Sequence, residues 1–447
     1  MMKILRIALS LCVLLTTISL CGCQKGGITI YDADNGKIAT VNSFPLKSEA
    51  LEKEGYRAFV EIALEEATTK VKEIEKCEAK EAIELMISKG YSVYTNFDKE
   101  TYSAVENAFS LYKNVSNEAA CAVTDLNGGL IAVFSKSEMG QNNAVAKRSP
   151  YSSIKPLSVY APAIEKNKIT CSTVTEDSPY KQIENNGVKT DWPNNADGNY
   201  SYSGCDLQTA VSRSLNTVAV KTLARVGVNE SIEFLEENFS FKLDFEKNKA
   251  NALGEEEVIG NIAMGYLQNG VSAVDMAGYY QAFANGGMYK APTAVRSISC
   301  GGREVYKETD VGKRAIESDT AYIMNQLLRT VVQKGATGED AYCENIAIGG
   351  KTGTGVSADG NWFVGFTPQM SCAVWHGSGS LKNSSPAIFG AVALDITKGN
   401  QTAYPPCDTV YKTVYCVDSG GKRTSGCKKI SVGYFRADTV LPECDLH

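Results

Sequence analysis

Two strand-rich stretches lie far apart in this chain, and a helical stretch separates them. Short apolar runs at Ala119–Thr124 and Leu130–Phe134, joined by the turn-forming segment Asp125–Gly129, predict a β-hairpin. A second group of strands is predicted over residues 346–396, with turns at 358–360 and 377–379. Because the two groups flank a helical middle, they are expected to meet in one sheet.

Helical patterns fill the space between the two strand groups. They cover residues 153–166, 206–226, 230–237, 273–285 and 317–334. A helical middle flanked by strands predicts an α+β fold, in which helices pack on a central antiparallel sheet built from both ends of the domain.

The first 22 residues have the pattern of an export signal. Met1–Arg6 carries two positive charges, and the apolar stretch Ile7–Gly22 follows. The sequence Leu20-Cys21-Gly22-Cys23 resembles a bacterial lipoprotein cleavage box, which implies that Cys23 is lipidated and that the chain is anchored at the extracytoplasmic face of the membrane. The alternative is an uncleaved N-terminal signal anchor, because the apolar stretch is nearly long enough to span a bilayer.

Two segments precede the main domain. Residues 23–47 are interpreted as a polar tether, and residues 48–89 as a helical stalk that is interrupted near Cys77 and ends at Gly90. A second interpretation is that the 48–89 helix recruits a separate glycosyltransferase. The net charge of −6, without a long basic run, argues against a nucleic-acid partner.

The cysteine count is high for a chain of this size. Of fourteen cysteines, Cys12 and Cys21 lie in the signal and Cys23 is the lipidation candidate, so eleven remain. No CxxC pair follows the signal, and neither a metal site nor a cofactor is therefore expected. Four cysteines lie in a C-terminal extension, residues 397–447, where export permits disulfides of undetermined pairing. They are Cys407, Cys416, Cys427 and Cys444.

Histidine is nearly absent, which limits the possible chemistry. The chain has two histidines, His376 in a strand-like run and the C-terminal His447, so a serine enzyme here would need another base. Ser152 and Lys155 form an S-x-x-K pattern one helical turn apart. Pro156 follows directly, and proline is tolerated only near the start of a helix, so Ser152 is expected at a helix N-terminus.

Two further patterns follow in a fixed order. Ser214 and Asn216 form an S-x-N triplet, and Lys351, Thr352 and Gly353 form a K-T-G strand that continues to Thr354. Each pattern is common alone. The order S-x-x-K, S-x-N, K-T-G is the signature of serine enzymes that react with β-lactams.

With these motifs the sequence resembles the transpeptidase domain of class A penicillin-binding proteins, here over residues 90–396 and into the tail. The likeness includes an opening strand, the nucleophile segment, the loop before S-x-N, the segment before K-T-G, the strand after it and a cysteine-bearing terminus. These are Gly90–Asp98, Arg148–Pro156, Pro193–Tyr200, Gly265–Pro292, Trp362–Pro368 and Tyr434–His447. Residues 1–89 are too few for the glycosyltransferase domain of that class, so a transpeptidase without that domain is expected.

The resemblance implies roles for the motif residues. Ser152 would attack a peptidoglycan stem ending in D-Ala-D-Ala and form an acyl-enzyme, and β-lactam antibiotics would acylate the same serine. Lys155 would be the base and Lys351 a source of positive potential. Ser214 would relay the proton to the leaving group, and Asn216 would hold the substrate amide.

The K-T-G strand would hold the rest of the substrate. Thr352 and Thr354 would bind the terminal carboxylate, and Gly353 would admit the substrate as an added strand. The backbone N–H groups of Ser152 and Thr354 would form the oxyanion hole. Tyr151, where the family usually has glycine, and Gly355, where a polar residue is common, depart from the family pattern.

Three alternatives share the same fold. A D,D-carboxypeptidase or a β-lactamase would hydrolyse the acyl-enzyme with water, and the motifs do not report which acceptor is used. A non-catalytic wall-binding or β-lactam-sensing protein is the third alternative, although all three motifs are intact.

Overall fold

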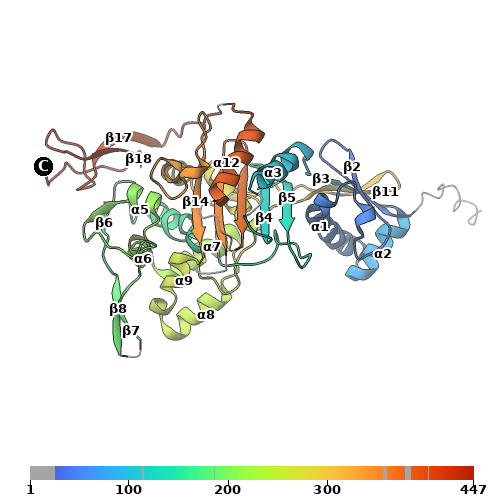
Figure 1. Cartoon of the computed structure of the whole chain (residues 1–447), viewed down its shortest axis with the longest axis horizontal. Helices are drawn as coiled ribbons and strands as arrows, with labels where there is room; N and C mark the ends of the chain where they lie inside the picture. Colours follow the sequence, from blue (N-terminus) through green and yellow to red (C-terminus); the bar gives the residue numbers. More distant parts are fainter. Residues whose placement is uncertain (1–25, 113–114, 186, 356–359, 378–383, 401) are drawn as a thin grey trace, which may run out of the picture. The chain divides into compact units, whose positions relative to one another are not determined.

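A computed structural model describes residues 26–112, 115–185, 187–355, 360–377, 384–400 and 402–447 (Figure 1). The predicted signal peptide and Cys23 lie outside the described residues. Within the described residues, no helix is long and apolar enough to cross a membrane. The chain divides into two compact units, the first ending at Phe97 but also including Ala294–Thr309, and the second comprising Asp98–Thr293 and Asp310–His447.

The first unit is a five-stranded sheet with two helices. Its strand order is β12-β11-β3-β1-β2, with β1 parallel to β3 and the other neighbours antiparallel. The elements are β1 Ile28–Tyr31, β2 Lys37–Val41, η1 Ser48–Ala50, η2 Glu54–Tyr56, α1 Arg57–Glu75, α2 Ala79–Lys89, β3 Ser92–Thr95, β11 Val295–Cys300 and β12 Arg303–Lys307.

The structure therefore differs from the predicted tether and stalk. Ile28, Ile30 and Ile38 are fully buried in strands where a polar tether was expected, because short strands with alternating apolar residues resemble a polar segment in composition. The predicted break near Cys77 and the end at Gly90 are both present, since α1 ends at a left-handed Lys76 and α2 at a left-handed Gly90.

The second unit contains the motifs. Its first half comprises α3 Lys99–Leu111, β4 Ala119–Thr124, β5 Leu130–Lys136, η3 Tyr151–Ile154, η4 Pro156–Tyr160, α4 Ala161–Glu165, β6 Val174–Glu176, β7 Lys181–Asn185, β8 Val188–Trp192, β9 Gly204–Asp206, α5 Leu207–Arg213, α6 Asn216–Val226, α7 Val228–Phe239, α8 Asp244–Leu253, η5 Glu255–Glu257 and α9 Ile259–Met264. Its second half comprises α10 Ala273–Tyr280, η6 Gln281–Phe283, β10 Met288–Tyr289, β13 Lys313–Arg314, α11 Ser318–Arg329, η7 Thr330–Val332, η8 Glu339–Ala341, β14 Gly349–Thr354, β15 Asn361–Phe366, β16 Ser371–His376, α12 Ser384–Thr397, β17 Val410–Cys416 and β18 Ile430–Arg436.

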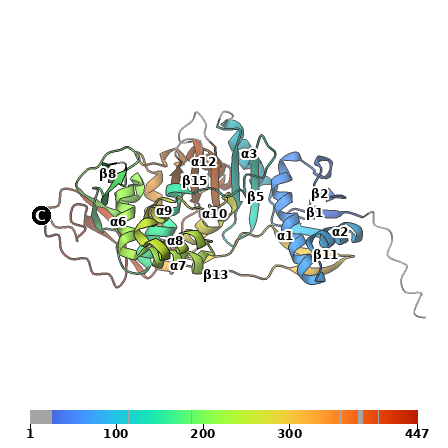
Figure 2. The ribbon, with the colours of Figure 1, turned by 90° about the horizontal axis from the view of Figure 1, so that it is seen from below.

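The central sheet of this unit confirms the predicted fold class. Its order is β14-β15-β16-β4-β5, and every neighbouring pair is antiparallel. The predicted hairpin supplies β4 and β5, and the later strand group supplies β14 to β16. α3 and α12 pack together beside β5 and β16, while α10 packs on β4, β15 and β16 (Figure 1). Figure 2 shows α6 to α9 gathered beside this core.

Three details of the sequence prediction are wrong. Residues 384–396 form α12 rather than strand, because Ile388, Phe389 and Val392 are buried at helical spacing. β3, expected to open the transpeptidase domain, pairs with β1 and β11 in the first unit. The 206–226 helix is broken by a left-handed Ser214. The predicted turns at 358–360 and 377–379 lie largely outside the described residues.

The tail forms a separate antiparallel hairpin, β17–β18. It is fastened to α5 by hydrogen bonds between the Gln208 side chain and both the Val432 carbonyl, at 2.7 Å, and the Ser431 hydroxyl, at 2.9 Å. The Tyr415 hydroxyl also donates to the carboxylate of Asp206, the residue that caps the N-terminus of α5. The tail thus contacts the helix that leads to Ser214.

Candidate active site

The predicted nucleophile segment, Arg148–Pro156, is held in place by the central sheet and by α10. The indole N–H of Trp362 donates to the Ser149 carbonyl at 3.1 Å, and the Tyr280 hydroxyl donates to the Ser153 carbonyl. The guanidinium of Arg148 lies over the ring of Trp375, with its Cζ 3.7 Å from the ring centroid. These contacts come from β15, β16 and α10, so the core of the domain fixes the position of Ser152.

Ser152 lies in the first turn of a short 3₁₀-helix, η3, and is half-buried. The N–H of Lys155 donates to the Ser152 carbonyl and closes that turn. Side chains three residues apart lie above one another in a 3₁₀-helix, so Ser152 and Lys155 share a face. Pro156 begins the next helical segment, η4, so it lies near a helix start as expected from the sequence.

Lys155 is fully buried and donates to two oxygens of the S-x-N motif. Its Nζ lies 2.8 Å from the Ser214 carbonyl oxygen and 2.7 Å from Asn216 Oδ1, and it approaches Ser214 Oγ to 3.4 Å. Burial, and then the charge of Lys351, hold the pKa of the Lys155 amine well below its usual range. A neutral amine with this environment is suited to accept a proton.

Lys351 approaches the same serine. Its Nζ donates to Ser214 Oγ at 2.8 Å and to the Thr352 carbonyl at 3.1 Å. Lys351 is fully buried in β14, and burial lowers its pKa to about 7. Ser214 Oγ is therefore the shared partner of both lysines. The backbone of Ser214, with a φ of 60°, adopts a left-handed conformation that costs energy for a residue other than glycine.

A buried polar network holds the S-x-N motif and was not predicted from the sequence. Asn195 Oδ1 accepts from the N–H of Asn216 at 2.9 Å, and its amide donates to Asp177 at 2.8 Å. The Thr217 hydroxyl donates to the same Asp177 oxygen at 2.7 Å, and the Asn216 amide donates to the Asn194 carbonyl at 2.7 Å. The Asn194-Asn195 pair within Pro193–Tyr200 was the available signal.

β14 forms an edge of the central sheet, with β15 as its ladder partner in the described part of the chain. Thr352 is half-buried and Thr354 is exposed, and the Thr352 hydroxyl donates to Thr337 at 3.1 Å. A Cβ built on Gly353 would lie 2.4 Å from the Pro150 carbonyl oxygen. Glycine is thus required for β14 to pack against the nucleophile segment.

The two departures from the family pattern meet at this site. Tyr151 is buried with a backbone φ of 50°, a conformation that glycine adopts without cost. The ring of Tyr151 packs against that of Tyr266, with 5.6 Å between the ring centroids. It also covers Gly355, where an added Cβ would lie 2.8 Å from Tyr151 Cε2. Tyr151 and Gly355 are therefore sterically complementary.

His376 is buried in β16 and hydrogen-bonded at both ring nitrogens, to the Gly377 carbonyl at 2.7 Å and the Ser384 hydroxyl at 2.6 Å. Burial lowers its pKa, so it is neutral at neutral pH. These contacts tie the end of β16 to the start of α12.

The structure thus brings residues of three distant motifs into one site. The sequence model of the penicillin-binding protein transpeptidase domain matches residues 112–393. The order of the three motifs agrees with this match. The chain belongs to this family.

Relatives and solved structures of penicillin-binding proteins agree. Penicillin-binding protein 1A of Clostridium botulinum is 29% identical over 445 residues, covering 93% of this chain and 51% of the relative. Penicillin-binding protein 1F of Bacillus subtilis is 30% identical over 311 residues, covering 66% of this chain and 40% of the relative. The chain thus spans about half the length of the curated relatives that it matches.

Solved structures share the fold. The D,D-transpeptidase domain of a peptidoglycan glycosyltransferase from Eggerthella lenta has a TM-score of 0.63 at 17% identity, covering 84% of this chain and 99% of that one. The Mycobacterium tuberculosis protein PonA1, in complex with penicillin V, has a TM-score of 0.62 at 20% identity, covering 78% of this chain and 96% of that one.

Proposed function

We propose that this chain is a serine D,D-transpeptidase that cross-links peptidoglycan stem peptides and is acylated by β-lactams. The observation that carries the proposal is the convergence of two buried lysines on Ser214, beside the turn that bears Ser152. Such an arrangement provides a base, a proton relay and positive potential without histidine.

Lys155 is the base in this proposal. A neutral amine has two N–H donors and one lone pair. Ser214 O and Asn216 Oδ1 accept from Lys155 at 2.8 Å and 2.7 Å, so the lone pair is left to take the proton of Ser152. Ser152 Oγ then attacks the carbonyl of the penultimate D-Ala, with the N–H groups of Ser152 and Thr354 as oxyanion hole.

Collapse of the tetrahedral intermediate breaks the C–N bond. The terminal D-Ala leaves with a proton that passes from Lys155 through Ser214 Oγ, which lies 3.4 Å from Lys155 Nζ and 2.8 Å from Lys351 Nζ. Lys351, Thr352 and Thr354 bind the terminal carboxylate, and an acceptor amine from a second stem then attacks the Ser152 ester.

The test is to follow both fates of the acyl-enzyme. The full chain in detergent is given a pentapeptide stem donor with and without an amine acceptor, and released D-Ala is compared with cross-linked product. Acceptor-dependent product formed by wild type and lost in Ser152→Ala supports transpeptidation. Release of D-Ala with no cross-linked product at saturating acceptor identifies a carboxypeptidase, and no turnover with stable β-lactam binding identifies a sensor.

We also propose that Cys23 anchors the chain to the extracytoplasmic face of the membrane, where a separate glycosyltransferase is a candidate partner. The Leu20-Cys21-Gly22-Cys23 box supports this proposal. Metabolic labelling with a fatty-acid analogue should mark the wild type and a Cys21→Ala control but not Cys23→Ala. Retention of residues 1–22 in the mature protein would contradict the lipoprotein assignment.

A further inference from the structure

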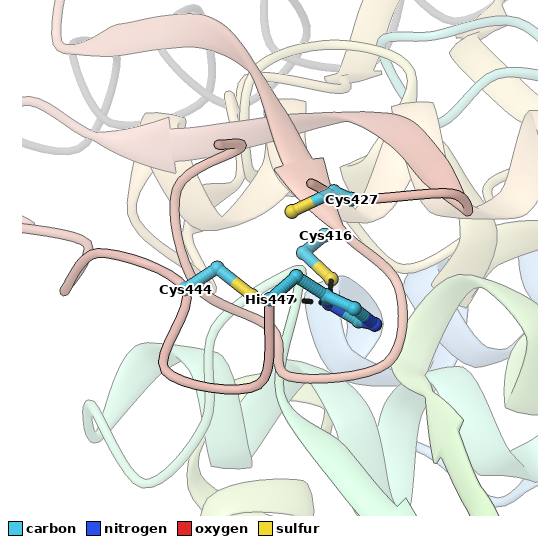
Figure 3. A group of neighbouring side chains, drawn as sticks. All are labelled: Cys416, Cys427, Cys444 and His447. Atoms are coloured by element: carbon cyan, nitrogen blue, oxygen red, sulfur yellow. Dashed lines mark hydrogen bonds between the residues drawn. The ribbon is translucent and has the colours of Figure 1, made fainter. Parts of the chain in front are cut away.

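Four side chains with metal-binding atoms converge in the C-terminal tail. They are Cys416, Cys427, Cys444 and His447, and one ligand atom of each lies within 4.8 Å of all the others (Figure 3). Cys416 ends β17, Cys427 lies in the connection to β18, and Cys444 and His447 lie at the chain terminus. Three separate segments thus supply one cluster.

The backbone holds these segments together. The N–H of Cys416 donates to the Gly421 carbonyl at 2.8 Å, and the N–H of Cys444 donates to the Lys422 carbonyl at 3.1 Å. The N–H of Lys422 donates to the Pro442 carbonyl at 2.7 Å. The chain terminus therefore lies along the loop after β17, and the cluster is formed by the fold rather than by side-chain rotation alone.

The spacing of the donor atoms fits a tetrahedral ion. Nδ1 of His447 lies 3.5 Å from Cys416 Sγ and 3.4 Å from Cys444 Sγ. Zn–S bonds of about 2.3 Å and a Zn–N bond of about 2.0–2.1 Å place the S and N corners of a tetrahedron about 3.6 Å apart. A disulfide would use two of the three sulfurs and would give no role to the imidazole.

The surroundings also suit a metal site. Nε2, the other ring nitrogen of His447, faces the Asp418 carboxylate at 3.9 Å, an arrangement that orients metal-binding histidines. The backbone N–H of Thr424 donates to Cys427 Sγ at 3.3 Å and holds this sulfur in place within the cluster. Cys416 and Cys444 are buried, so two of the sulfurs are shielded from solvent.

We propose that Cys416, Cys427, Cys444 and His447 bind a structural Zn²⁺ ion that fastens the chain terminus to the β17–β18 hairpin. A two-stranded hairpin is marginally stable alone, and a closed Cys₃His site supplies the missing stabilisation. The expectation that this chain has no metal site rested on the lack of a CxxC pair and overlooked the Cys444-x-x-His447 pair. The ion would act at a distance from Ser152 and would take no part in acyl transfer.

The test measures metal on the full chain, purified in detergent under mild reduction and without chelator. We expect about one zinc per chain in wild type and in the control Cys407→Ser, whose thiol lies in the same tail but outside the cluster. Cys444→Ser should lose the zinc. Replacement by Co²⁺ should give the visible absorption of a tetrahedral thiolate complex in wild type and in Cys407→Ser, but not in Cys444→Ser.

Two more variants keep the proposal falsifiable if Cys444→Ser misfolds. His447→Ala removes the ring at the chain terminus, and Asp418→Asn removes the carboxylate behind it. Each should weaken zinc affinity, the second by about 10–100-fold. Complete labelling of Ser152 by fluorescent penicillin verifies that the domain is folded. A zinc-free wild type that does not take up added Zn²⁺ or Co²⁺, zinc content unchanged by Cys444→Ser and His447→Ala, or a disulfide among the three thiols would overturn the proposal.

Discussion

The ring of Tyr151 occupies the space that a side chain at Gly355 would fill. A Cβ on Gly355 would lie 2.8 Å from Cε2 of Tyr151, closer than real Cβ contacts. Each residue alone departs from the family pattern, yet together they are complementary. Tyr151 directly precedes Ser152 and Gly355 directly follows β14, so this pair, like Gly353 with Pro150, lies where η3 packs against β14.

Gly355→Thr should therefore disturb the site. We expect it to destabilise the domain by about 1–3 kcal/mol, as overpacking does, and to slow acylation by penicillin. Combining Tyr151→Gly with Gly355→Thr should recover part of the lost stability and part of the lost acylation rate. The recovery is only partial because the Gly360 carbonyl oxygen, also 2.8 Å from the added Cβ, remains in place. Thermal unfolding and acylation rates of the four proteins form a double-mutant cycle, and additive effects would refute the coupling.

Lys155→Ala should slow acylation by about 10²–10⁴-fold, the usual contribution of a general base. The matched control is Lys166→Ala. Lys166 is an exposed residue directly after α4 that forms an ion pair with Glu230, so its removal should leave the acylation rate unchanged. Stopped-flow acylation by a fluorescent penicillin decides the matter. A near-normal rate in Lys155→Ala would show that another group takes the proton.

The charge of Lys351 predicts a particular pH dependence. Its pKa of about 7 means that the ammonium is present below pH 7 and is lost as pH rises through 7. Acylation by a carboxylate-bearing penicillin should thus fall as the pH rises through about 7.

Lys351→Arg separates this effect from others, because a guanidinium stays charged throughout. We expect the variant to be slower by about 10²–10³-fold, as for a lost electrostatic contact, and to lack the alkaline decline. The second-order acylation rate is measured from acid to alkaline pH in both proteins. An alkaline decline that persists unchanged in Lys351→Arg would assign it to a different group.

Ser214 combines a hydroxyl that both Lys155 and Lys351 approach with a left-handed backbone conformation. Ser214→Ala and Ser214→Gly both remove Oγ, so both should slow acylation to the same extent. Glycine relieves the left-handed conformation at φ 60°, and Ser214→Gly should be the more stable by about 1 kcal/mol. Equal stability of the two variants, measured by chemical denaturation, would show that the strain is negligible.

The central sheet was predictable because its strands are short apolar runs bounded by clear turn signals, as at Ala119–Thr124. The motif residues were also predictable as a set, since their residue types and order restrict the chemistry. Their mutual contacts were not, because the 2.8 Å approach of Lys351 to Ser214 joins residues 137 positions apart in the sequence.

Other features depend on tertiary contacts that no local pattern reports. α12 is apolar on most of its surface, as a buried strand would be, and only its packing on α3 and β16 identifies the buried face. Ile28–Tyr31 forms a strand between β2 and β3, and β11, from a distant part of the chain, pairs with the other edge of β3. The complementarity of Tyr151 with Gly355 likewise arises only when η3 and β14 are adjacent.

The central claim is that Ser152 is the acylated nucleophile. The full chain is labelled with fluorescent penicillin, digested, and the adduct is located by mass spectrometry. The account predicts one adduct, on the peptide containing Ser152, and none on the Ser152→Ala protein. Ser110 and Ser178 begin two other S-x-x-K patterns in this sequence. A stable adduct on Ser152→Ala, or an adduct on Ser110 or Ser178 in the wild type, would contradict the claim.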